Sequence, residues 1–514
     1  MAPARQPAKI FAALGASIAV AMAFGVAAAL AALGDITGTG CIAQSGSTAS
    51  GCTATGGNAL GGAFGVAGSP DGKSVYVTGF FDDSISVFSR AANGDLTATG
   101  CIAKSGSAAS GCTATGGNAL ERARGLAVSP DGRSVYVTGF FDNSISVFSR
   151  AANGDLTGTG CIEKPGSGVP GCTATGGGAL GGADEVAVSA DGKSVYVTGA
   201  ADDSISVFSR AANGDLTGTG CIAKSGSTAT GCTATGGNAL KGASGLAVSP
   251  DGTSVYVAGS NDNSISVFSR AANGDLTGTG CIAKSGSTAS GCTATGGGAL
   301  MGAAEIAASP DGKSVYVTAI SDNSISVFSR AANGDLTGTG CIAKAGSAAS
   351  GCTATGGGAL GGADGVVVSP DGKSVYVAGS IDDSVAVFSR AANGDLTGTG
   401  CIAKSGSTAS GCTATGGGAL GGAAGLAASP DGESFYVTGS IDNSVSVFAR
   451  RTDPCVGDCH ATGTVSIADL INGVDIALGT QPIGNCPAFD ADNSGTVSVN
   501  ELVQGVNNAL IGCP

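Results

Sequence analysis

The chain has 514 residues, of which 92 are glycine, 18 are cysteine and none is tryptophan. A hydrophobic fraction of 42% excludes a disordered chain, and the absence of a Gly-X-Y period excludes a collagen-like one. The formal net charge of −14, with no basic stripe, argues against nucleic acid and anionic membrane surfaces as partners.

The first 33 residues have the pattern of an export signal. Arg5 and Lys9 precede an apolar, alanine-rich stretch from Ile10 to about Leu33, which ends among small residues suited to cleavage. We therefore predict a signal peptide over residues 1–33 and a secreted, cell-surface or periplasmic protein. The stretch is long for a cleaved signal, so an uncleaved membrane anchor is the alternative, and only then do we expect contact with a membrane.

A 60-residue unit then recurs seven times. Its motif Ser-Pro-Asp-Gly begins at Ser69, and Ala190 replaces the proline in the third copy. A unit of this size cannot bury its own hydrophobic face, so the copies must stack on one another. The repeat predicts one domain over residues 34–451. The motif returns at Ser129, Ser249, Ser309, Ser369 and Ser429.

Each copy contains four short strand signals. In the second copy these are residues 125–129, 134–138, 144–148 and 156–161, which are rich in β-branched and aromatic residues and are separated by tight turns. Four antiparallel strands per unit, repeated seven times, predict an all-β fold, a seven-bladed β-propeller. A β-solenoid is the alternative, although its coils are usually shorter.

The ends of the repeat region are complementary. The chain enters at residues 34–38, which match the fourth strand of a blade, and it leaves after residues 448–450, which match the third. We therefore expect the N-terminal strand to complete the last blade and close the ring.

The repeats carry 14 cysteines at fixed spacing. Cys41 and Cys52 form the first predicted pair, and the pattern continues every 60 residues to Cys401 and Cys412. Regular, even spacing after an export signal predicts disulfides formed in an oxidising compartment. Zinc is the competing interpretation, but no repeat contains a histidine to complete a site.

The repeat resembles a known family. The segments from Ser69 to Gly79 and from Asp142 to Arg150 are similar to the YVTN-type repeat of the lactonase-like seven-bladed propellers, over about residues 34–451. The chain departs from that repeat by carrying glycine, as at Gly139, where the name of the repeat has asparagine. The resemblance implies the propeller fold, and it makes hydrolysis of cyclic esters one expected activity.

Differences between the copies are concentrated before the first strand and after the second. We expect both places to lie on one face, at the mouth of the central channel, where loops on a rigid scaffold can bind a ligand such as a protein or a carbohydrate. Drift at exposed loops and a rigid-spacer role are the alternatives. Because the propeller lacks histidine, the sequence favours binding over hydrolysis, and the repeated acids of the Asp82 type are interpreted as solvated. The candidate ligand-binding residues are Phe80, Phe81, Arg122, Arg124, Phe140, Phe141, Asp184, Glu185 and Glu305.

Composition changes sharply after Arg451. Residues 452–514 contain seven acidic residues, four cysteines and no lysine or arginine, and the segment 463–470 is repeated in 495–502. Each copy leads into an apolar pattern of helical period. We predict a small α-helical, EF-hand-like domain stapled by two disulfides among Cys455, Cys459, Cys486 and Cys513, whose connectivity stays open.

The second loop of this domain fits a Ca²⁺ site. Residues 490–501 match the 12-residue EF-hand loop, with a turn glycine at its sixth position. A helix capping box formed by Ser498 and Glu501 is the structural alternative, and both roles can coexist. The predicted ligands of the Ca²⁺ cofactor are Asp490, Asp492, Ser494, Thr496, Ser498 and Glu501.

The first loop is a weaker candidate. Asp458 and Asp469 hold its end positions, but His460 and Thr462 replace the acids expected between them, so a degenerate site at Asp458, Thr462, Thr464 and Asp469 is predicted. The pair of loops resembles EF-hand pairs of the dockerin kind, which implies a protein partner for this domain.

Overall fold

The computed structural model describes residues 36–55, 59–115, 119–175, 177–235, 239–295, 299–355, 358–415, 419–450, 455–460, 464–491 and 494–512. The chain divides into two compact units, residues 33–452 and a unit that contains residues 453–514, and each is considered separately. The predicted signal peptide at residues 1–33 lies outside the described residues. Within the ranges above, no helix is long and apolar enough to cross a membrane.

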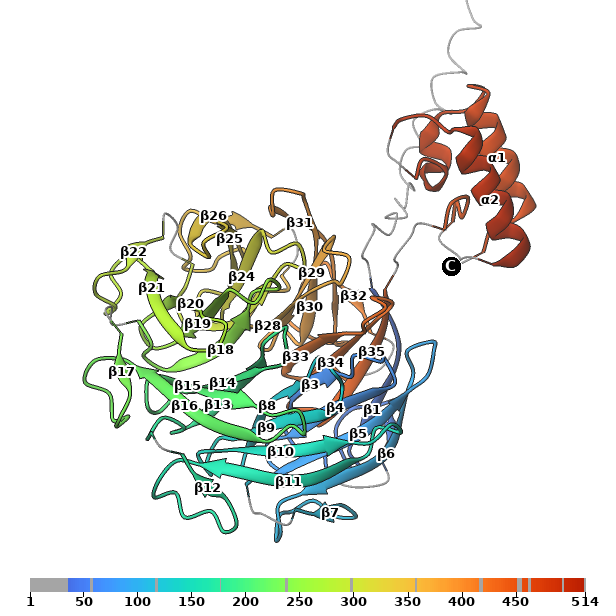
Figure 1. The fold of residues 1–514 in the computed structure, drawn as a ribbon. Coiled ribbons are helices and arrows are strands. Elements are labelled where there is room, and N and C mark those ends of the chain that lie inside the picture. The colour runs from blue at the N-terminus through green and yellow to red at the C-terminus, as the bar shows by residue number, and fades with distance from the viewer. Residues whose placement is uncertain are drawn as a thin grey trace, which may run out of the picture. The chain divides into compact units, whose positions relative to one another are not determined.

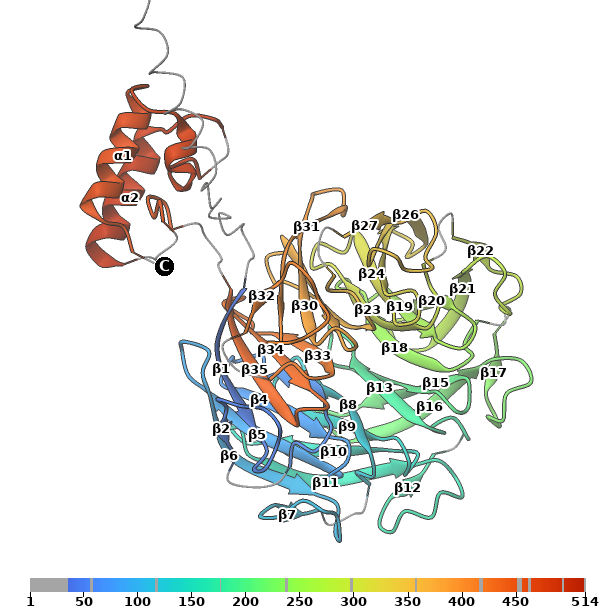
Figure 2. The same ribbon diagram turned by 180° about the vertical axis from the view of Figure 1, so that it is seen from behind.

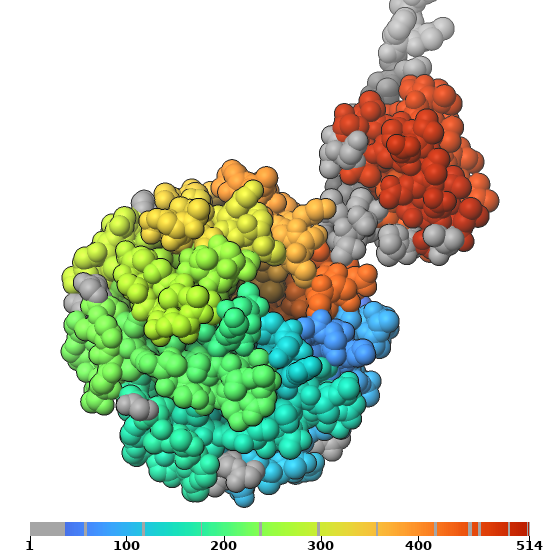
Figure 3. All heavy atoms as spheres, viewed as in Figure 1, coloured from blue at the N-terminus to red at the C-terminus, as the bar shows by residue number. Residues whose placement is uncertain are grey.

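Seven sheets form the first unit, a seven-bladed β-propeller (Figures 1 and 2). The innermost strands of neighbouring blades touch one another around a central channel. The colour sequence in Figure 3 follows the chain around the ring, so consecutive copies of the repeat are neighbouring blades. The fold class predicted from the repeat is confirmed.

The strands occupy equivalent positions in every blade. From blade 1 to blade 7, the innermost are β3 (Ala63–Gly68), β8 (Ala123–Val128), β13 (Ala183–Val188), β18 (Ala243–Val248), β23 (Ala303–Ala308), β28 (Ala363–Val368) and β33 (Ala423–Ala428). In the same order, the second are β4 (Ser74–Gly79), β9 (Ser134–Gly139), β14 (Ser194–Gly199), β19 (Ser254–Gly259), β24 (Ser314–Ala319), β29 (Ser374–Gly379) and β34 (Ser434–Gly439). The third are β5 (Ser84–Arg90), β10 (Ser144–Arg150), β15 (Ser204–Arg210), β20 (Ser264–Arg270), β25 (Ser324–Arg330), β30 (Ser384–Arg390) and β35 (Ser444–Arg450). The fourth are β6 (Leu96–Ala103), β11 (Leu156–Glu163), β16 (Leu216–Ala223), β21 (Leu276–Ala283), β26 (Leu336–Ala343), β31 (Leu396–Ala403) and β1 (Ile36–Ala43). The fifth are β7 (Thr113–Ala114), β12 (Thr173–Ala174), β17 (Thr233–Ala234), β22 (Thr293–Ala294), β27 (Thr353–Ala354), β32 (Thr413–Ala414) and β2 (Thr53–Ala54).

The ring is closed by the two ends of the repeat region. Strand β1 pairs antiparallel with β35, from Ile36 opposite Arg450 to Ala43 opposite Ser444. Figure 2 shows β1 beside β35 in the last blade. The predicted closure is confirmed, and it leaves no blade without its outer strands.

The structure corrects the predicted number of strands per blade from four to five. The fifth strand has only two residues and pairs parallel with the end of the fourth, as Thr53 and Ala54 do with Ile42 and Ala43. The seven predicted disulfides are confirmed, and each joins the fourth strand to the loop before the fifth, with a Cα–Cα distance of 4.6–4.7 Å. Such a set of disulfides is typical of a protein that folds in an oxidising compartment.

The hydrophobic core lies between blades. Tyr76 and Ile85 of blade 1 pack with Leu126, Val135 and Phe148 of blade 2, and the same arrangement recurs around the ring. Each repeat therefore buries its apolar face only against its neighbour, as the size of the unit requires.

Polar residues of the repeat tie neighbouring blades together. Nη2 of Arg150 in blade 2 lies 2.9 Å from Oδ1 of Asp71 in blade 1, and Nε of Arg150 donates to the hydroxyl of Tyr76. Arg90 and Asp431 form the same pair at 2.7 Å between the first and last blades. These contacts explain why the charged residues of the motif recur in every copy.

The acids of the Asp82 type are not solvated, which corrects the sequence interpretation. Asp202 is only 1% exposed, accepts from the backbone N–H of Gly181 at 2.5 Å and lies 2.6 Å from Nζ of Lys164 in the previous blade. A buried carboxylate of this kind requires such partners, so the repeated acid of each copy is an interblade tie.

The second unit is built on two helices, α1 (Ile467–Ala477) and α2 (Val499–Ile511), with short 3₁₀ turns η1 (Ile483–Asn485) and η2 (Pro487–Phe489). Phe489 is fully buried, and it packs so closely on Gly473 and Gly505 that a Cβ at either glycine would lie 2.5 Å from the ring. Cys459 and Cys486 form a disulfide, which resolves one of the open pairings. Cys513 lies outside the described residues.

Candidate functional site

The central channel is lined by the innermost strands. The third residue of these strands is glycine in five blades, because the next blade approaches closely: a Cβ at Gly125 would lie 2.4 Å from the carbonyl oxygen of Asp184. Blades 3 and 5 carry Glu185 and Glu305 at this position instead. These glutamates depart from the register that the close approach favours, and both side chains line the channel.

Charged groups gather in a cavity of about 150 Å³ in this channel. Glu185, Glu305 and Asp364 line it, and Oε1 of each glutamate accepts from the N–H of the residue that follows it, at 3.1 Å. Nε of Arg124 lies 2.7 Å from Oδ1 of Asp184, an ion pair in distance without the geometry of a hydrogen bond. We call Arg124, Asp184, Glu185, Glu305 and Asp364 the channel cluster.

Burial shifts the acids of the channel cluster toward their protonated forms. Desolvation and the neighbouring charge of Asp184 raise the pKa of Glu185 to about 8. Desolvation raises the pKa of Asp364 to about 6, although the charge of Arg124 opposes it, and raises that of Asp184 against the same charge. Desolvation and the charge of Glu185 raise the pKa of Glu305 well above its ordinary value. Protein surrounds these groups, yet the side chains of the two glutamates and Asp364 keep part of their surface in the channel.

Aromatic rings and a second arginine lie beside this cluster. The guanidinium carbon of Arg122 lies 5.1 Å from the ring centre of Phe81 and 5.5 Å from that of Phe141, which joins blades 1 and 2. That of Arg124 lies 4.7 Å from the centre of Phe64. Cation–π contacts of this kind hold the guanidinium groups in place. We call Phe64, Phe80, Phe81, Arg122, Phe140 and Phe141 the mouth cluster.

The backbone at Arg122 is unusual. Its φ of 55° lies in the left-handed region, where the other six copies have glycine. A side chain in this region costs about 1–2 kcal/mol, and such conformations are concentrated at functional sites. The arginine is therefore held at the mouth at a cost to stability.

All nine residues predicted to bind a ligand fall in these two clusters. The structure corrects their placement, because Arg124, Asp184, Glu185 and Glu305 lie within the innermost strands rather than in the connections that precede them. The two variable regions do share one face, since the N–H of Phe80 and Phe81 donate to the carbonyls of Gly62 and Gly61.

Two residues of the clusters, Phe64 and Asp364, were not predicted as site residues. They occupy the same register as Arg124 and Asp184, 60 and 180 residues from them in the repeat. Variation at one fixed register of the repeat is the signal that identifies both of them.

In the part of the chain that the structure describes, no three acidic, histidine or cysteine side chains form a group able to hold a metal ion. The channel cluster itself is a set of proton donors and acceptors with an ion pair, which are the components of general acid–base chemistry.

The second loop of the C-terminal unit brings two of the predicted calcium ligands into ordered positions. Asp490 accepts from the N–H of Ser494 at 2.8 Å and of Gly495 at 2.9 Å, and Glu501 accepts from the N–H of Ala491 at 2.7 Å. Glu501 also completes the capping box with Ser498, so the structural alternative is observed. Each carboxylate oxygen keeps a lone pair for a cation. Asp492 lies outside the described residues.

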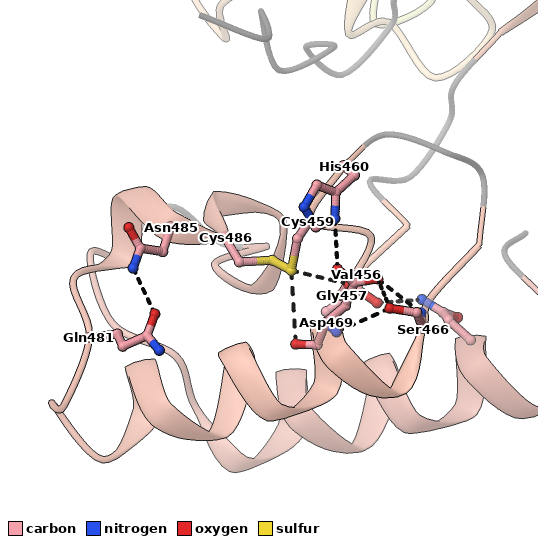
Figure 4. Close-up of a disulfide and its surroundings, with 10 residues drawn as sticks. Val456, Gly457, Cys459, His460, Ser466, Asp469, Gln481, Asn485 and Cys486 are labelled. Atoms are coloured by element: carbon pink, nitrogen blue, oxygen red, sulfur yellow. Dashed lines mark hydrogen bonds and ion pairs between the residues drawn. A yellow bond between two sulfur atoms is a disulfide. The ribbon is translucent and has the colours of Figure 1, made fainter. Parts of the chain in front are cut away.

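The first loop is occupied by its own hydrogen bonds (Figure 4). Nδ1 of His460 lies 3.0 Å from Oδ1 of Asp469, whose other oxygen accepts from the N–H and hydroxyl of Ser466. Burial opposes ionisation of Asp469, but the hydrogen bonds from Ser466 and His460 hold its pKa below the usual range. With one carboxylate committed in this way, the residues present fit Ca²⁺ poorly. Thr462 lies outside the described residues.

Comparison with known proteins agrees with the fold. A family model described as lactonase, 7-bladed beta-propeller, matches residues 121–229. This segment is similar to lactonase-type propellers, and it contains Arg122, Arg124, Asp184 and Glu185. No curated protein matches the chain significantly.

Solved structures of similar fold share little sequence. A putative 6-phosphogluconolactonase from Bacteroides uniformis is 18% identical over 66% of this chain and 84% of its own, with a TM-score of 0.46. The periplasmic gluconolactonase PpgL of Pseudomonas aeruginosa is 18% identical over 68% and 85%, with a TM-score of 0.47. Hydrazine synthase of Kuenenia stuttgartiensis is 16% identical over 77% and 97%, also at 0.47. At this distance, these likenesses carry no argument about activity.

Proposed function

We propose that the central channel is a small-molecule site and that its reaction is the hydrolysis of a cyclic ester. The observation that carries this proposal is that Glu185 and Asp364, whose pKa values of about 8 and about 6 lie on either side of neutrality, line one cavity. Pairs of titratable groups pushed apart in this way are typical of acid–base catalysis. The local match to the lactonase family model gives the reaction class.

In this proposal each group has one role. Asp364, ionised at neutral pH, accepts a proton from the water that attacks the ester carbonyl carbon. Glu185, protonated at neutral pH, donates its proton to the alkoxide oxygen that leaves as the ring opens, so the net reaction adds one water across the acyl C–O bond. Arg122 at the mouth orients an anionic or hydroxyl-bearing part of the substrate.

Hydrolysis of a panel of five- and six-membered lactones by the mature protein tests the proposal. We expect turnover with a bell-shaped pH profile whose limbs lie near the two pKa values, and its loss in Glu185→Gln and in Asp364→Asn. Glu433→Gln, an exposed acid far along the repeat from either, is the matched control. Equal turnover in all four proteins, or none in the unmodified protein, contradicts the assignment.

A specific observation favours a second candidate, the binding of a partner protein on the same face. Phe81, Phe141, Ile381 and Ile441 occupy one position of the loop between the second and third strands in four consecutive blades, and each is 55–68% exposed. Exposed apolar groups clustered in this way mark interaction sites. Changing all four to serine removes partner binding in this case and leaves lactone turnover intact.

For the C-terminal unit we propose an exported, dockerin-like module that binds Ca²⁺ in its second loop. The ordered positions of Asp490 and Glu501 support this ion. Its helices also expose an aliphatic stripe suited to a protein partner, and the exposed fractions run from 43% to 78%. The stripe consists of Ile467, Ile471, Val474 and Leu478 on α1 and of Val499, Val503, Val506 and Leu510 on α2.

The YVTN assignment of the repeat is also proposed rather than established. It is supported by the motif from Ser69 to Gly79 and by the way its residues are used, since Ser69 and Asp71 shape the turn and Tyr76 ties two blades.

A further inference from the structure

The rim of the propeller contains a pocket that recurs from blade to blade. Pockets at equivalent positions of blades 1, 3, 4 and 6 have volumes of about 180–250 Å³. In blade 4 the pocket is formed by the third and fourth strands, β20 and β21, and by the connection that arrives from blade 3. Figure 1 shows these outer strands at the periphery of the ring, away from the channel.

The pocket is open because a glycine leaves it open. Gly280 of β21 lies opposite Val267 of β20, and a Cβ at Gly280 would meet nothing within 4 Å. Its φ is not left-handed, so neither packing nor backbone conformation requires glycine there. The same holds at the equivalent residues Gly100, Gly160, Gly220 and Gly340. Keeping this space free therefore needs another explanation.

The lining has the chemistry of a site for a neutral polyol. No charged residue lines any of the four pockets. The hydroxyls of Ser266 and Thr279 donate to the carbonyls of Ala239 and Val267 and keep their acceptor lone pairs. The ring of Phe268 closes the floor. A charged ligand would find no partner here, and an acyl chain would meet polar groups.

The backbone beside the pocket is also available for hydrogen bonds. The fifth strand β22 pairs only with Ile282 and Ala283, so among the described residues the outer edge of β21 before Ile282 has no neighbouring strand. Edge N–H and C=O groups of this kind accept partners readily. A pocket of about 180 Å³ holds roughly six water molecules, which suits one sugar ring rather than a larger ligand.

We propose that these rim pockets bind single units of a neutral saccharide and that the ring of copies binds a polysaccharide multivalently. Weak individual sites on one rigid ring gain affinity together when a polymer spans several of them. This role is independent of the channel chemistry, because the pockets lie on the outer strands and share no residue with the channel cluster.

Titration calorimetry of the full-length mature protein with neutral glucan, mannan and galactan oligosaccharides tests the proposal. We expect at least one of these glycans to bind with more than one unit per chain. We also expect little change in affinity between about 0.05 and 1 M salt, since no charge is involved. No binding of any of them, one site per chain, or binding abolished by salt overturns the proposal, and the pockets are then water-filled gaps between blades.

Paired variants locate the sites. Gly100→Val with Gly280→Val should lower the stoichiometry by the two filled pockets and weaken binding to the polymer by at least about tenfold, with unchanged lactone turnover. Ala92→Val with Ala272→Val adds bulk at exposed hairpin positions of the same blades and is the matched control. The smaller Gly→Ala pair serves if the valine pair does not fold. Full stoichiometry in a folded glycine variant, or equal loss in the control, contradicts the assignment.

Discussion

Nε of Arg124 and Oδ1 of Asp184 lie 2.7 Å apart and join the innermost strands of blades 2 and 3 inside the channel. Asp184 is only 5% exposed, so its charge depends on this partner. The same arginine is stacked on Phe64 and Phe140 of the mouth cluster. One side chain thus connects the aromatic mouth with the acids of the channel.

The first prediction concerns this ion pair. Arg124→Met removes the positive charge from beside Asp184 and should lower the free energy of unfolding by roughly 2–4 kcal/mol at pH 8. The loss should be smaller at pH 5, where the buried acids can take up protons. Urea denaturation at both pH values measures it, with Arg133→Met at an exposed turn as the control. The double variant with Asp184→Asn should recover most of the loss, and no recovery would show that the two side chains act independently.

The second prediction concerns the proton on Glu185. Between its ordinary pKa of about 4.5 and its folded value of about 8, the folded protein holds a proton that the unfolded chain has lost. Stability therefore falls as the pH rises through this window. Glu185→Gln removes the effect and should be more stable than the unmodified protein by about 1–2 kcal/mol at pH 9, with no gain at pH 4, because the partly open channel reduces the full shift. Thermal unfolding at the two pH values decides, and an equal difference at both would contradict the raised pKa.

The third prediction concerns the strained backbone of Arg122. Arg122→Gly and Arg122→Ala both lose the guanidinium group, but only alanine keeps a Cβ in the left-handed region. The glycine variant should therefore be the more stable by about 1 kcal/mol. Gly182→Ala, at the equivalent position of blade 3 with φ of 60°, should show a loss of similar size relative to its glycine. Equal stability of the two Arg122 variants would mean that the loop relaxes.

The fourth prediction concerns the rim disulfides. Replacing Cys101 and Cys112 together by serine opens a loop of 11-residue separation and should cost about 2–3 kcal/mol. Because the fifth strand has only two residues, Thr113 and Ala114 should lose amide protection from hydrogen exchange, whereas Val135 and Val137 in the core should keep theirs. Loss of protection throughout the blade would show that the disulfide supports more than the rim.

The fifth prediction concerns calcium. Calorimetric titration should find one dominant site, lost in Asp490→Asn and in Glu501→Gln and largely kept in Asp458→Asn. Because Glu501 also caps α2, Asp490→Asn is the cleaner variant, and its helix content in circular dichroism should match that of the unmodified protein. Equal loss in all three variants, or no calcium heat, contradicts the assignment of the second loop.

Much of the fold follows from the repeat alone. The 60-residue period, the turn motifs and the complementary ends predicted seven blades and their closure, because each unit must bury its apolar face against the next. Cysteine spacing predicted the rim disulfides. The fifth strand could not be predicted, since two residues such as Thr53 and Ala54 carry no periodic signal and pair only because the disulfide holds them beside the fourth strand.

The candidate site divides in the same way. Variation between copies identified Arg122, Arg124, Asp184, Glu185 and Glu305 from the sequence by itself, because identical repeats make every departure visible. Only the tertiary structure decided that they converge, since residues 60 to 180 positions apart meet when seven innermost strands surround one channel. Ring closure also turned repeated acids such as Asp202 from apparent surface charges into buried ties, because burial and partner distance are properties of the assembled ring and not of the local sequence.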